Sequence, residues 1–239
     1  MNVVISQPMF FPWVGMFEQI RLADVYIHYS DVQFSKGSFV NRVQIKTAEG
    51  IKWLTVPLRG LSLGQNINEV LIDERKDWRR QHVATLLRAY RDSRHCAEMI
   101  SLVESVYSNR YETIDQLSEA SLLAVCRFFG LDIGRRYLDV QDLGVKGESS
   151  RRVLDLVLKV GGDCYITGLG ASHYLDHALF ETCSVSVKYM EYRKMVYPQL
   201  HGPFTPYVSV LDLIANLGRA GVACIVSQTI HWKVFVEHG

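Results

Sequence analysis

Short apolar runs alternate with helical patterns at both ends of the chain. Four runs have the length and apolar content of buried strands: residues 3–5, 25–29, 164–167 and 185–189. Apolar positions at helical spacing lie between them, over residues 13–22, on a stripe that includes Val153 and Val157, and in a segment that begins at Ser172. Strands that alternate with helices form parallel sheets with helices on their faces. We therefore expect an α/β fold with a mostly parallel sheet built from both ends of the chain.

The middle of the chain follows two other patterns. Residues 39–45 and 52–56 are extended runs on either side of a turn in which Gly50 relieves strain, so they predict an antiparallel hairpin. Residues 76–130 carry helical patterns, with Thr113 and Gln116 at the spacing of a capping box. We expect one α/β domain over residues 1–239, with 76–130 as a central helical insertion that could form a subdomain.

A loop rich in proline and aromatic residues stops the first strand abruptly. Pro8 and Pro12 lock φ and lack an amide hydrogen, so the loop cannot continue a ladder, and a helix can begin at or just after Pro12. The carboxyl end of the first strand is a place where α/β folds bind ligands. Gln7, Phe11 and Trp13 are therefore candidate substrate-binding residues. The alternative is that the aromatic side chains only fill the core, and the residues alone leave both interpretations open.

Composition and charge are those of an ordinary intracellular protein. Hydrophobic residues make up 48% of the 239 positions and the net charge is +1, so nothing indicates a surface for nucleic acid. The chain shows no secretory signal and no apolar run long enough to span a membrane, so we expect a cytoplasmic protein. The five cysteines lack any C-x-x-C spacing, which argues against a disulfide framework or a zinc site.

A glycine-containing turn follows the strand at residues 164–167. Gly168 and Gly170 precede a predicted helix, so backbone amides there could reach a phosphate or a carboxylate, with Ser172 and Tyr174 nearby. The turn lacks the full G-x-G-x-x-G pattern and a Walker lysine. A plain strand-to-helix turn capped by Ser172 is the alternative.

A second group of candidates surrounds the predicted hairpin. Arg42 offers a planar clamp for a carboxylate or phosphate, and Asp31 could act as a base or bind sugar hydroxyls. Asn41 and Gln33 are candidate substrate-binding neighbours. The alternative for this group is an internal salt bridge that pins the hairpin to the loop.

The histidines give little support for a metal. His173 and His177 are spaced i, i+4, which a metal could use on a helix, but no H-E-x-x-H accompanies them and we expect no metal site. A contact with substrate or a structural role for His173 is favoured. No G-x-S-x-G elbow occurs, which argues against a Ser-His-Asp hydrolase.

The last group of candidates follows residue 196. Gln199 and Phe204 lie in a proline-stiffened loop, and Asp212 and Asn216 lie one turn apart on a predicted helix for which Ser209 is a natural N-cap. Aromatic faces beside Asp, Asn and Gln are what a sugar ring needs. These four residues are candidates for substrate binding.

Several motifs follow one another in a recognisable order. They are Gln7-Pro8, Phe11-Pro12, Gly15 and Phe17; Asp24, Asp31 and Gln33; Asn41-Arg42; residues 53–57; Trp78, His82 and Tyr90; residues 165–168; Tyr174-Leu175; residues 197–199; Phe204; and Ser209 to Asp212 with Asn216 and Gly218. Over roughly residues 2–218 the chain resembles the WbqC-like protein family. The resemblance implies a role in building bacterial surface polysaccharides, notably O-antigen, in which an amino acid such as glycine is transferred onto an amino sugar.

The leading hypothesis is a cytoplasmic transferase that acylates or aminoacylates a nucleotide-linked amino sugar. Asp31 or His173 would deprotonate the attacking amine, and amides at Gly168 or Gly170 would hold the diphosphate or the developing oxyanion. The donor would be an acyl or aminoacyl compound, nucleic acid would be a partner only if that donor is an aminoacyl-tRNA, and a homo-oligomer is an open alternative.

Two other hypotheses remain. One is an ATP-dependent, adenylate-forming ligase for the same amide bond, because the opening of the chain also resembles nucleotidyltransferase and pantothenate-synthetase-type folds. The histidines that hold ATP phosphates in those folds are missing here, so ATP is the less favoured cofactor. The other is a non-enzymatic partner that binds a sugar nucleotide.

Overall fold

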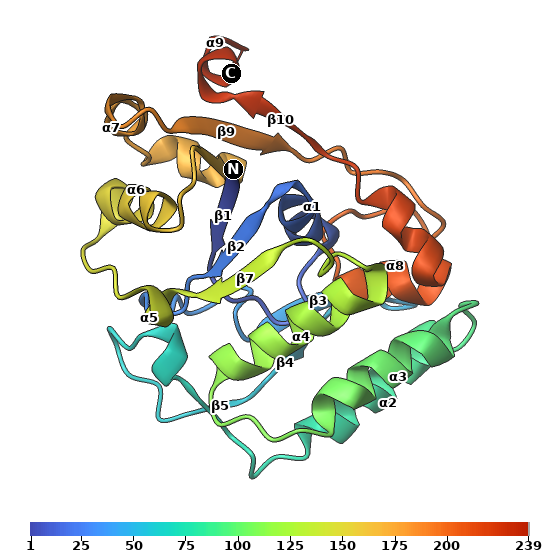
Figure 1. The fold of residues 1–239 in the computed structure, drawn as a ribbon. Helices are drawn as coiled ribbons and strands as arrows, with labels where there is room; N and C mark the ends of the chain where they lie inside the picture. The colour runs from blue at the N-terminus through green and yellow to red at the C-terminus, as the bar shows by residue number, and fades with distance from the viewer. Residues whose placement is uncertain (239) are drawn as a thin grey trace.

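The computed structural model describes residues 1–238 and contains a six-stranded sheet at its centre (Figure 1). In spatial order its strands are β7 (Arg136–Asp139), β2 (Val25–His28), β1 (Asn2–Ser6), β8 (Cys164–Thr167), β9 (Ser186–Glu191) and β10 (Gln228–His231). The first five run parallel and β10 pairs antiparallel with β9. Both ends of the chain contribute to the sheet, so the predicted fold class is confirmed.

Burial explains why these segments form the centre of the sheet. Every residue of β2 and β8 is buried, as are the three central residues of β1. A strand of a parallel sheet that is covered on both faces must be apolar along its whole length. The strands that the sequence did not reveal, β7 and β10, lie at the two edges of the sheet and are only partly buried. Their short, mixed sequences lack the apolar run on which the prediction depended.

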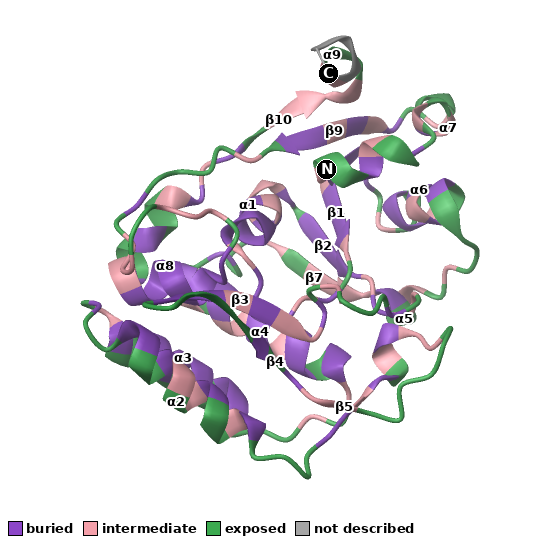
Figure 2. Cartoon of the chain, turned by 180° about the vertical axis from the view of Figure 1, so that it is seen from behind, coloured by how far each residue is buried: buried purple, intermediate pink, exposed green. Residues whose placement is uncertain are grey.

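Helices cover both faces of the sheet. One core cluster joins the sheet to α6 (Ser149–Lys159) and α7 (His177–Thr182), and a larger one joins its other face to α1 (Val14–Leu22), α4 (Ile114–Phe129) and α8 (Val210–Leu217). The short α5 (Val140–Leu143) follows β7, and α9 (Trp232–His238) follows β10. The buried strands and the exposed outer faces of α2 (Trp78–Tyr90) and α3 (Cys96–Tyr107) are visible in Figure 2.

The predicted hairpin is confirmed as β3 (Arg42–Thr47) and β4 (Gly50–Thr55). A second, short antiparallel pair, β5 (Leu58–Arg59) and β6 (Leu71–Ile72), encloses the 3-10 turn Ile67–Glu69. The helical block follows as α2, α3 and α4, and the predicted capping box of α4 is present between Thr113 and Gln116. These helices share one apolar cluster with α1, α8 and the hairpin.

One helix does not begin where the sequence predicted. Residues Leu169–His173 form a 3-10 turn, and α7 begins at His177 with Asp176 as its cap, whose side chain accepts a hydrogen bond from the Leu179 amide. His173 and His177 therefore lie in different elements, and their i, i+4 spacing does not place them on one helix. The segment after residue 218, which the sequence left unassigned, forms the 3-10 turn Gly218–Cys224, then β10 and α9.

Glu18 joins α1 to the segment that leads into β10. Its side chain is fully buried, accepts a hydrogen bond from the Ser227 hydroxyl, and lies 3.4 Å from the Val226 amide nitrogen. Burial raises the pKa of Glu18 to about 7, although Arg21 and Arg193 oppose the shift. The folded protein therefore favours the protonated carboxyl group.

We expect stability to fall as the pH rises, and Glu18→Gln to remove part of that fall. The folded pKa is about 7 against an ordinary value of 4.5. Below about pH 4.5 the buried carboxyl group therefore does not lower the free energy of unfolding, and the loss grows until the pH exceeds 7. The shift corresponds to at most about 3 kcal/mol. Urea unfolding at pH 5 and pH 8 should show the glutamine variant gaining about 2 kcal/mol on the wild type at the higher pH. Parallel pH profiles for the two proteins would contradict this.

Candidate functional site

The order of the strands creates a crevice beside the carboxyl end of β1. Numbered by their succession along the chain, the strands of the sheet lie in the order 3-2-1-4-5-6. The chain leaves β1 for β2 on one side, while β8 pairs with β1 on the other. The strand order therefore reverses between β1 and β8, and the connections that leave these two strands run away from each other and leave a crevice. Doubly wound sheets bind ligands in this crevice.

A cleft of about 410 Å³ lies at this position. We call it the switch-point cleft; its lining residues are Ile5, Ser6, Gln7, Met9, Gln19, Tyr29, Val153, Tyr165, Thr167, Gly168, Gly170, Ala171 and Tyr174. Of the candidates from the sequence, it brings together Gln7, Gly168, Gly170 and Tyr174. The strand ends that predicted a site therefore do enclose a cavity.

The switch-point cleft is polar but uncharged. Within the described chain, none of its lining residues is Asp, Glu, Lys, Arg or His. Its polar side chains are the hydroxyls of tyrosines, Ser6 and Thr167 and the amides of Gln7 and Gln19. The Tyr165 hydroxyl donates to the Thr167 hydroxyl at 3.3 Å, and burial raises the pKa of Tyr165, which keeps that phenol neutral. Tyr174 is 67% exposed at the rim. Flat rings and amide groups suit a ligand with a planar ring and hydrogen-bonding edges.

Gly168 shapes the cleft through its lack of a side chain. A Cβ atom at this position would lie 2.9 Å from Nε2 of Gln19, whereas one at Gly170 would meet open space. The turn at Gly168 thus lets the Gln19 side chain of α1 approach β8 closely. Ser172 does not cap a following helix; its hydroxyl donates to the Leu169 carbonyl at 2.7 Å. His173 is exposed and does not line the cleft.

Asp31 lies just beyond the end of β2 in an ion pair with Arg152 of α6. Arg152 Nη2 donates to Oδ2 of Asp31 at 2.5 Å, and Nη1 donates to the Tyr29 hydroxyl at 3.4 Å. The Arg152 side chain is only 7% exposed, and its Nε donates to the Val145 carbonyl. Because Tyr29 lines the switch-point cleft, this pair stands at the border of the cleft.

Phe11 and Trp13, the two aromatic candidates of the proline-rich loop, pack against other parts of the protein. Phe11 is fully buried with a φ of 38°; its amide donates to the Ser121 hydroxyl at 2.9 Å, and its carbonyl accepts from the Ser209 hydroxyl at 2.8 Å. The Trp13 ring packs edge-on against Tyr192 with centroids 4.7 Å apart. Neither residue lines the switch-point cleft. This arrangement matches the core-filling alternative that the sequence left open.

The candidates after residue 196 meet in a buried network elsewhere. Asp212 is fully buried and accepts hydrogen bonds from the hydroxyls of Tyr90 and Tyr197 at 3.0 and 2.9 Å. Asn216 donates to Asp212, and Gln199 joins the Tyr197 hydroxyl to the buried Lys46 ammonium. Burial raises the pKa of Asp212, although the two phenols oppose the shift.

Phe204 packs against Tyr197 in the same region, with ring centroids 5.2 Å apart. None of Gln199, Phe204, Asp212 and Asn216 lines the switch-point cleft. Their contacts fix the loop of residues 197–209 against α8 and β3.

The candidates near the hairpin also make local contacts. Arg42 donates to the Gly37 carbonyl, and its guanidinium carbon lies 4.2 Å from the centroid of the Trp53 ring. Asn41 donates to the Val56 carbonyl at 2.9 Å. Gln33 forms an isolated bridge with Asn66. Arg42 is therefore not the partner of Asp31.

Gln19, Tyr29 and Arg152 are among the residues of this region that the sequence analysis did not identify as site residues. Arg152 lies on the buried face of α6, one turn before the buried Leu156. A buried arginine requires a carboxylate partner, and that was the available signal. The partner itself, 121 positions away, is set by the fold.

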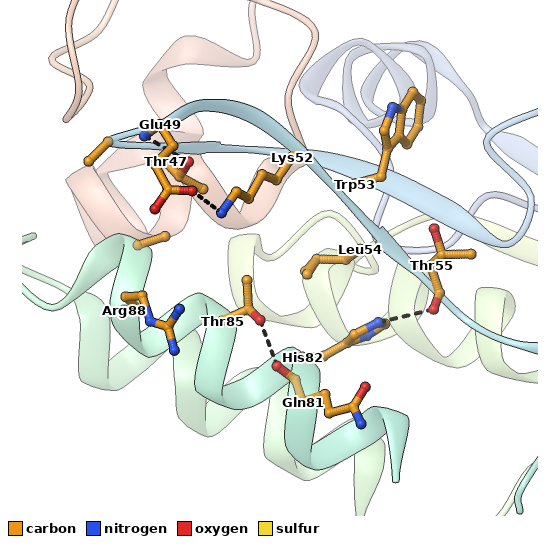
Figure 3. A pocket seen from close by; sticks show the side chains of 12 residues that line it. Thr47, Glu49, Lys52, Trp53, Leu54, Thr55, Gln81, His82, Thr85 and Arg88 are labelled. Atoms are coloured by element: carbon orange, nitrogen blue, oxygen red, sulfur yellow. Dashed lines mark hydrogen bonds and ion pairs between the residues drawn. The ribbon is translucent and has the colours of Figure 1, made fainter. Parts of the chain in front are cut away.

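A second pocket of about 410 Å³ lies between the hairpin and α2 (Figure 3). Lys52 pairs with Glu49 on one wall. His82 Nε2 donates to the Thr55 carbonyl at 3.2 Å, and its Nδ1 accepts from the Tyr107 hydroxyl at 3.0 Å. Burial lowers the pKa of His82 to about 4, so it is neutral at physiological pH. No described residue of this lining carries a buried polar atom without a partner. The switch-point cleft is therefore the stronger candidate.

The described residues contain neither a metal-binding cluster nor a membrane-spanning helix. Among residues 1–238, no group of three or more His, Cys, Asp or Glu side chains is placed to hold a metal ion. No helix in the described part is both long enough and apolar enough to cross a bilayer.

Comparisons with known proteins agree with the motif order. The model of the WbqC-like protein family matches residues 7–224. An uncharacterized protein, Rv1507c, of Mycobacterium tuberculosis (strain ATCC 25618 / H37Rv) is 33% identical over 220 residues, which cover 91% of this chain and 94% of that protein. No solved structure matches the chain.

Proposed function

Because this chain belongs to the WbqC-like protein family, we propose that it is a transferase of bacterial surface-polysaccharide (O-antigen) biosynthesis. It acylates or aminoacylates the amino group of a nucleotide-linked sugar in the cytoplasm, with glycine as one candidate acyl group. The observation that carries the proposal is the position of the switch-point cleft, between the carboxyl ends of β1 and β8 in a sheet of order 3-2-1-4-5-6. Sheets of this order bind nucleotides there.

The lining of the cleft supports a nucleotide as the bound part of the substrate. The tyrosine rings offer faces for a base, and the amides of Gln7 and Gln19 offer both donors and acceptors to its edge. The uncharged lining gives no cluster of cations for a triphosphate, which favours a nucleoside diphosphate sugar over ATP. Backbone amides at Gly168 and Gly170 are the proposed donors to phosphate or to an oxyanion.

Asp31 is the proposed general base. Arg152 holds Oδ2, so the carboxylate is oriented while Oδ1 is left without a hydrogen-bond partner among the described residues. The sugar amine attacks the carbonyl carbon of an activated acyl donor, such as a thioester or an aminoacyl ester. A C–N bond forms, the bond to the leaving group breaks, and Oδ1 takes the amine proton and returns it to the leaving group.

A thermal-shift screen tests this proposal. Ligands that bind the native state raise its melting temperature, and a ligand at 100 times its Kd adds about 2.7 kcal/mol of stability. We expect stabilisation by UDP-, dTDP- or GDP-linked sugars and a smaller effect of ATP. Stabilisation by ATP alone, with release of AMP during amide formation, would support the ligase instead.

Gly168→Ala provides the site-specific arm of the screen. Its Cβ would displace Gln19, so we expect the ligand-induced shift to fall by at least half while the ligand-free protein still melts cooperatively. Thr85→Ala, in the pocket between the hairpin and α2, is the control and should keep the full shift. Equal shifts in all three proteins would place the ligand elsewhere.

A further inference from the structure

A polar hollow of about 420 Å³ opens beside the switch-point cleft, at the carboxyl ends of β2 and β7. Its lining residues are Asp31, Asn66, Asn68, Val140, Gln141, Gly144, Val145, Lys146, Gly147 and Arg152. They come from the segments that follow β2 and β7, the turn before β6, and the start of α6. The hollow therefore lies at the same edge of the sheet as the switch-point cleft, one strand further along.

Two acceptor oxygens at this hollow have no hydrogen-bond partner among the described residues. Asp31 Oδ2 is held by Arg152, but Oδ1 is buried and unpaired. Asn68 donates through Nδ2 to Gln141 at 3.1 Å, which leaves Oδ1 buried and unpaired. Buried acceptors nearly always have a hydrogen-bond partner in native proteins, because a buried acceptor without one lowers the free energy of unfolding. Both residues line the hollow, so a ligand bound in it is placed to supply the missing donors.

The charges around the hollow select among such ligands. Arg152 and Lys146 contribute two cations against the single carboxylate of Asp31, and Lys146 makes no ion pair or hydrogen bond within the described chain. This excess of positive charge disfavours an ammonium ion. Neutral hydroxyl groups and an uncharged amine donate hydrogen bonds without that penalty, and a nearby diphosphate would gain from Lys146.

The hollow and the cleft share a border. Arg152 lines the hollow and donates to the hydroxyl of Tyr29, whose ring lines the cleft; the Arg152 guanidinium carbon lies 5.1 Å from the centroid of that ring. A ligand with two parts joined by a short linker fits this pair of adjoining cavities. A nucleoside diphosphate sugar has that shape.

We infer that this hollow is the sugar subsite of the proposed transferase, with the nucleotide in the switch-point cleft. The sugar amino group donates to Asp31 Oδ1, a neighbouring hydroxyl donates to Asn68 Oδ1, and Lys146 faces the diphosphate. This inference rests on the proposed function, because it assigns the second half of the same substrate. It makes Asn68 a specificity-determining residue that distinguishes a sugar nucleotide from the nucleotide alone.

Calorimetric titration with matched ligand pairs tests the subsite. The probes are UDP with UDP-glucose, dTDP with dTDP-glucose, and GDP with GDP-mannose. For at least one pair, the wild type should bind the sugar conjugate more tightly than the diphosphate. Asn68→Ala should weaken the conjugate about five- to tenfold, the size of one lost hydrogen bond, and change the diphosphate less than twofold.

Two variants guard against a trivial loss of structure. Asn68→Asp loses the hydrogen bond to Gln141 but keeps an acceptor oxygen at this position, so it should retain part of the preference for the conjugate. Thr85→Ala lies outside both cavities and should bind like the wild type. Equal affinity of the wild type for both members of every pair, or an unchanged preference in Asn68→Ala, would overturn the subsite and leave the nucleotide site standing. Failure of every probe to bind the wild type would overturn the proposed function as well.

Discussion

Replacing Asp31 with asparagine is expected to lower amide formation by about 10²–10⁴-fold while the protein stays folded. The asparagine side chain cannot take a proton from the attacking amine. Its carbonyl oxygen can still accept from Arg152 Nη2, which donates to Asp31 at 2.5 Å in the wild type. The buried arginine therefore keeps a hydrogen-bond partner, and the loss should fall on turnover more than on stability.

The measurement is product formation by mass spectrometry, with a nucleotide-linked amino sugar and an activated acyl donor, alongside a melting curve for each protein. Asp155→Asn is the matched control. Asp155 pairs with the exposed Arg151 at 3.0 Å on α6, the helix that also carries Arg152. This control should keep wild-type turnover. Unchanged turnover in Asp31→Asn would remove Asp31 from the mechanism, and an equal loss in both variants would point to a general effect on α6.

Replacing Asp212 with alanine is expected to destabilise the protein by about 3–5 kcal/mol. The carboxyl group is fully buried, and its removal leaves the hydroxyls of Tyr90 and Tyr197 without their acceptor, whereas Asn216 keeps its bond to the backbone carbonyl of residue 212. Each unpaired buried donor costs about 1–3 kcal/mol, partly offset by rearrangement. Urea unfolding monitored by circular dichroism gives the free energy of unfolding directly.

Asp212→Asn separates the network from the charge. The amide oxygen still accepts one phenol, so the cost should be roughly half that of alanine. The exposed Asp132, changed to alanine, should alter stability by less than about 0.5 kcal/mol. If Asp212→Ala were as stable as the wild type, the buried network would not hold the loop of residues 197–209 in place. A normal ligand-induced shift in Asp212→Asn would assign Asp212 to structure and not to substrate binding.

How far the sequence predicted the fold depended on burial. The strands β1, β2 and β8 are buried along their central residues, so their apolar runs marked them, and Gly50 marked the turn of the hairpin. The edge strand β7 is only partly buried, and its sequence RYLD has no period that separates it from a loop. Edge strands need less apolar surface, so their sequences carry a weaker signal.

The candidate site was predicted in part for a related reason. Gln7 and Gly168 stand directly at strand ends, where local sequence and fold topology coincide. The pair of Asp31 and Arg152 spans 121 positions, so no local pattern could join its members. Asp212 and Asn216 were correctly placed on one helix face. The sequence pattern of a polar helix face is the same, however, whether that face contacts a ligand or buried tyrosines. Only the fold distinguishes the two.

The strained backbone of Phe11 has a consequence for synthesis of the protein in the cell. Its φ of 38° is held by Ser121 and Ser209, which lie 110 and 198 positions further along the chain. At a translation rate of about 5–20 residues per second, Ser209 leaves the ribosome about 10–40 s after Phe11. The loop that carries Gln7 must therefore wait for most of the polypeptide before it reaches its final shape. The loop with Gln7 is thus the first part of the cleft to be synthesised and the last to reach its final conformation.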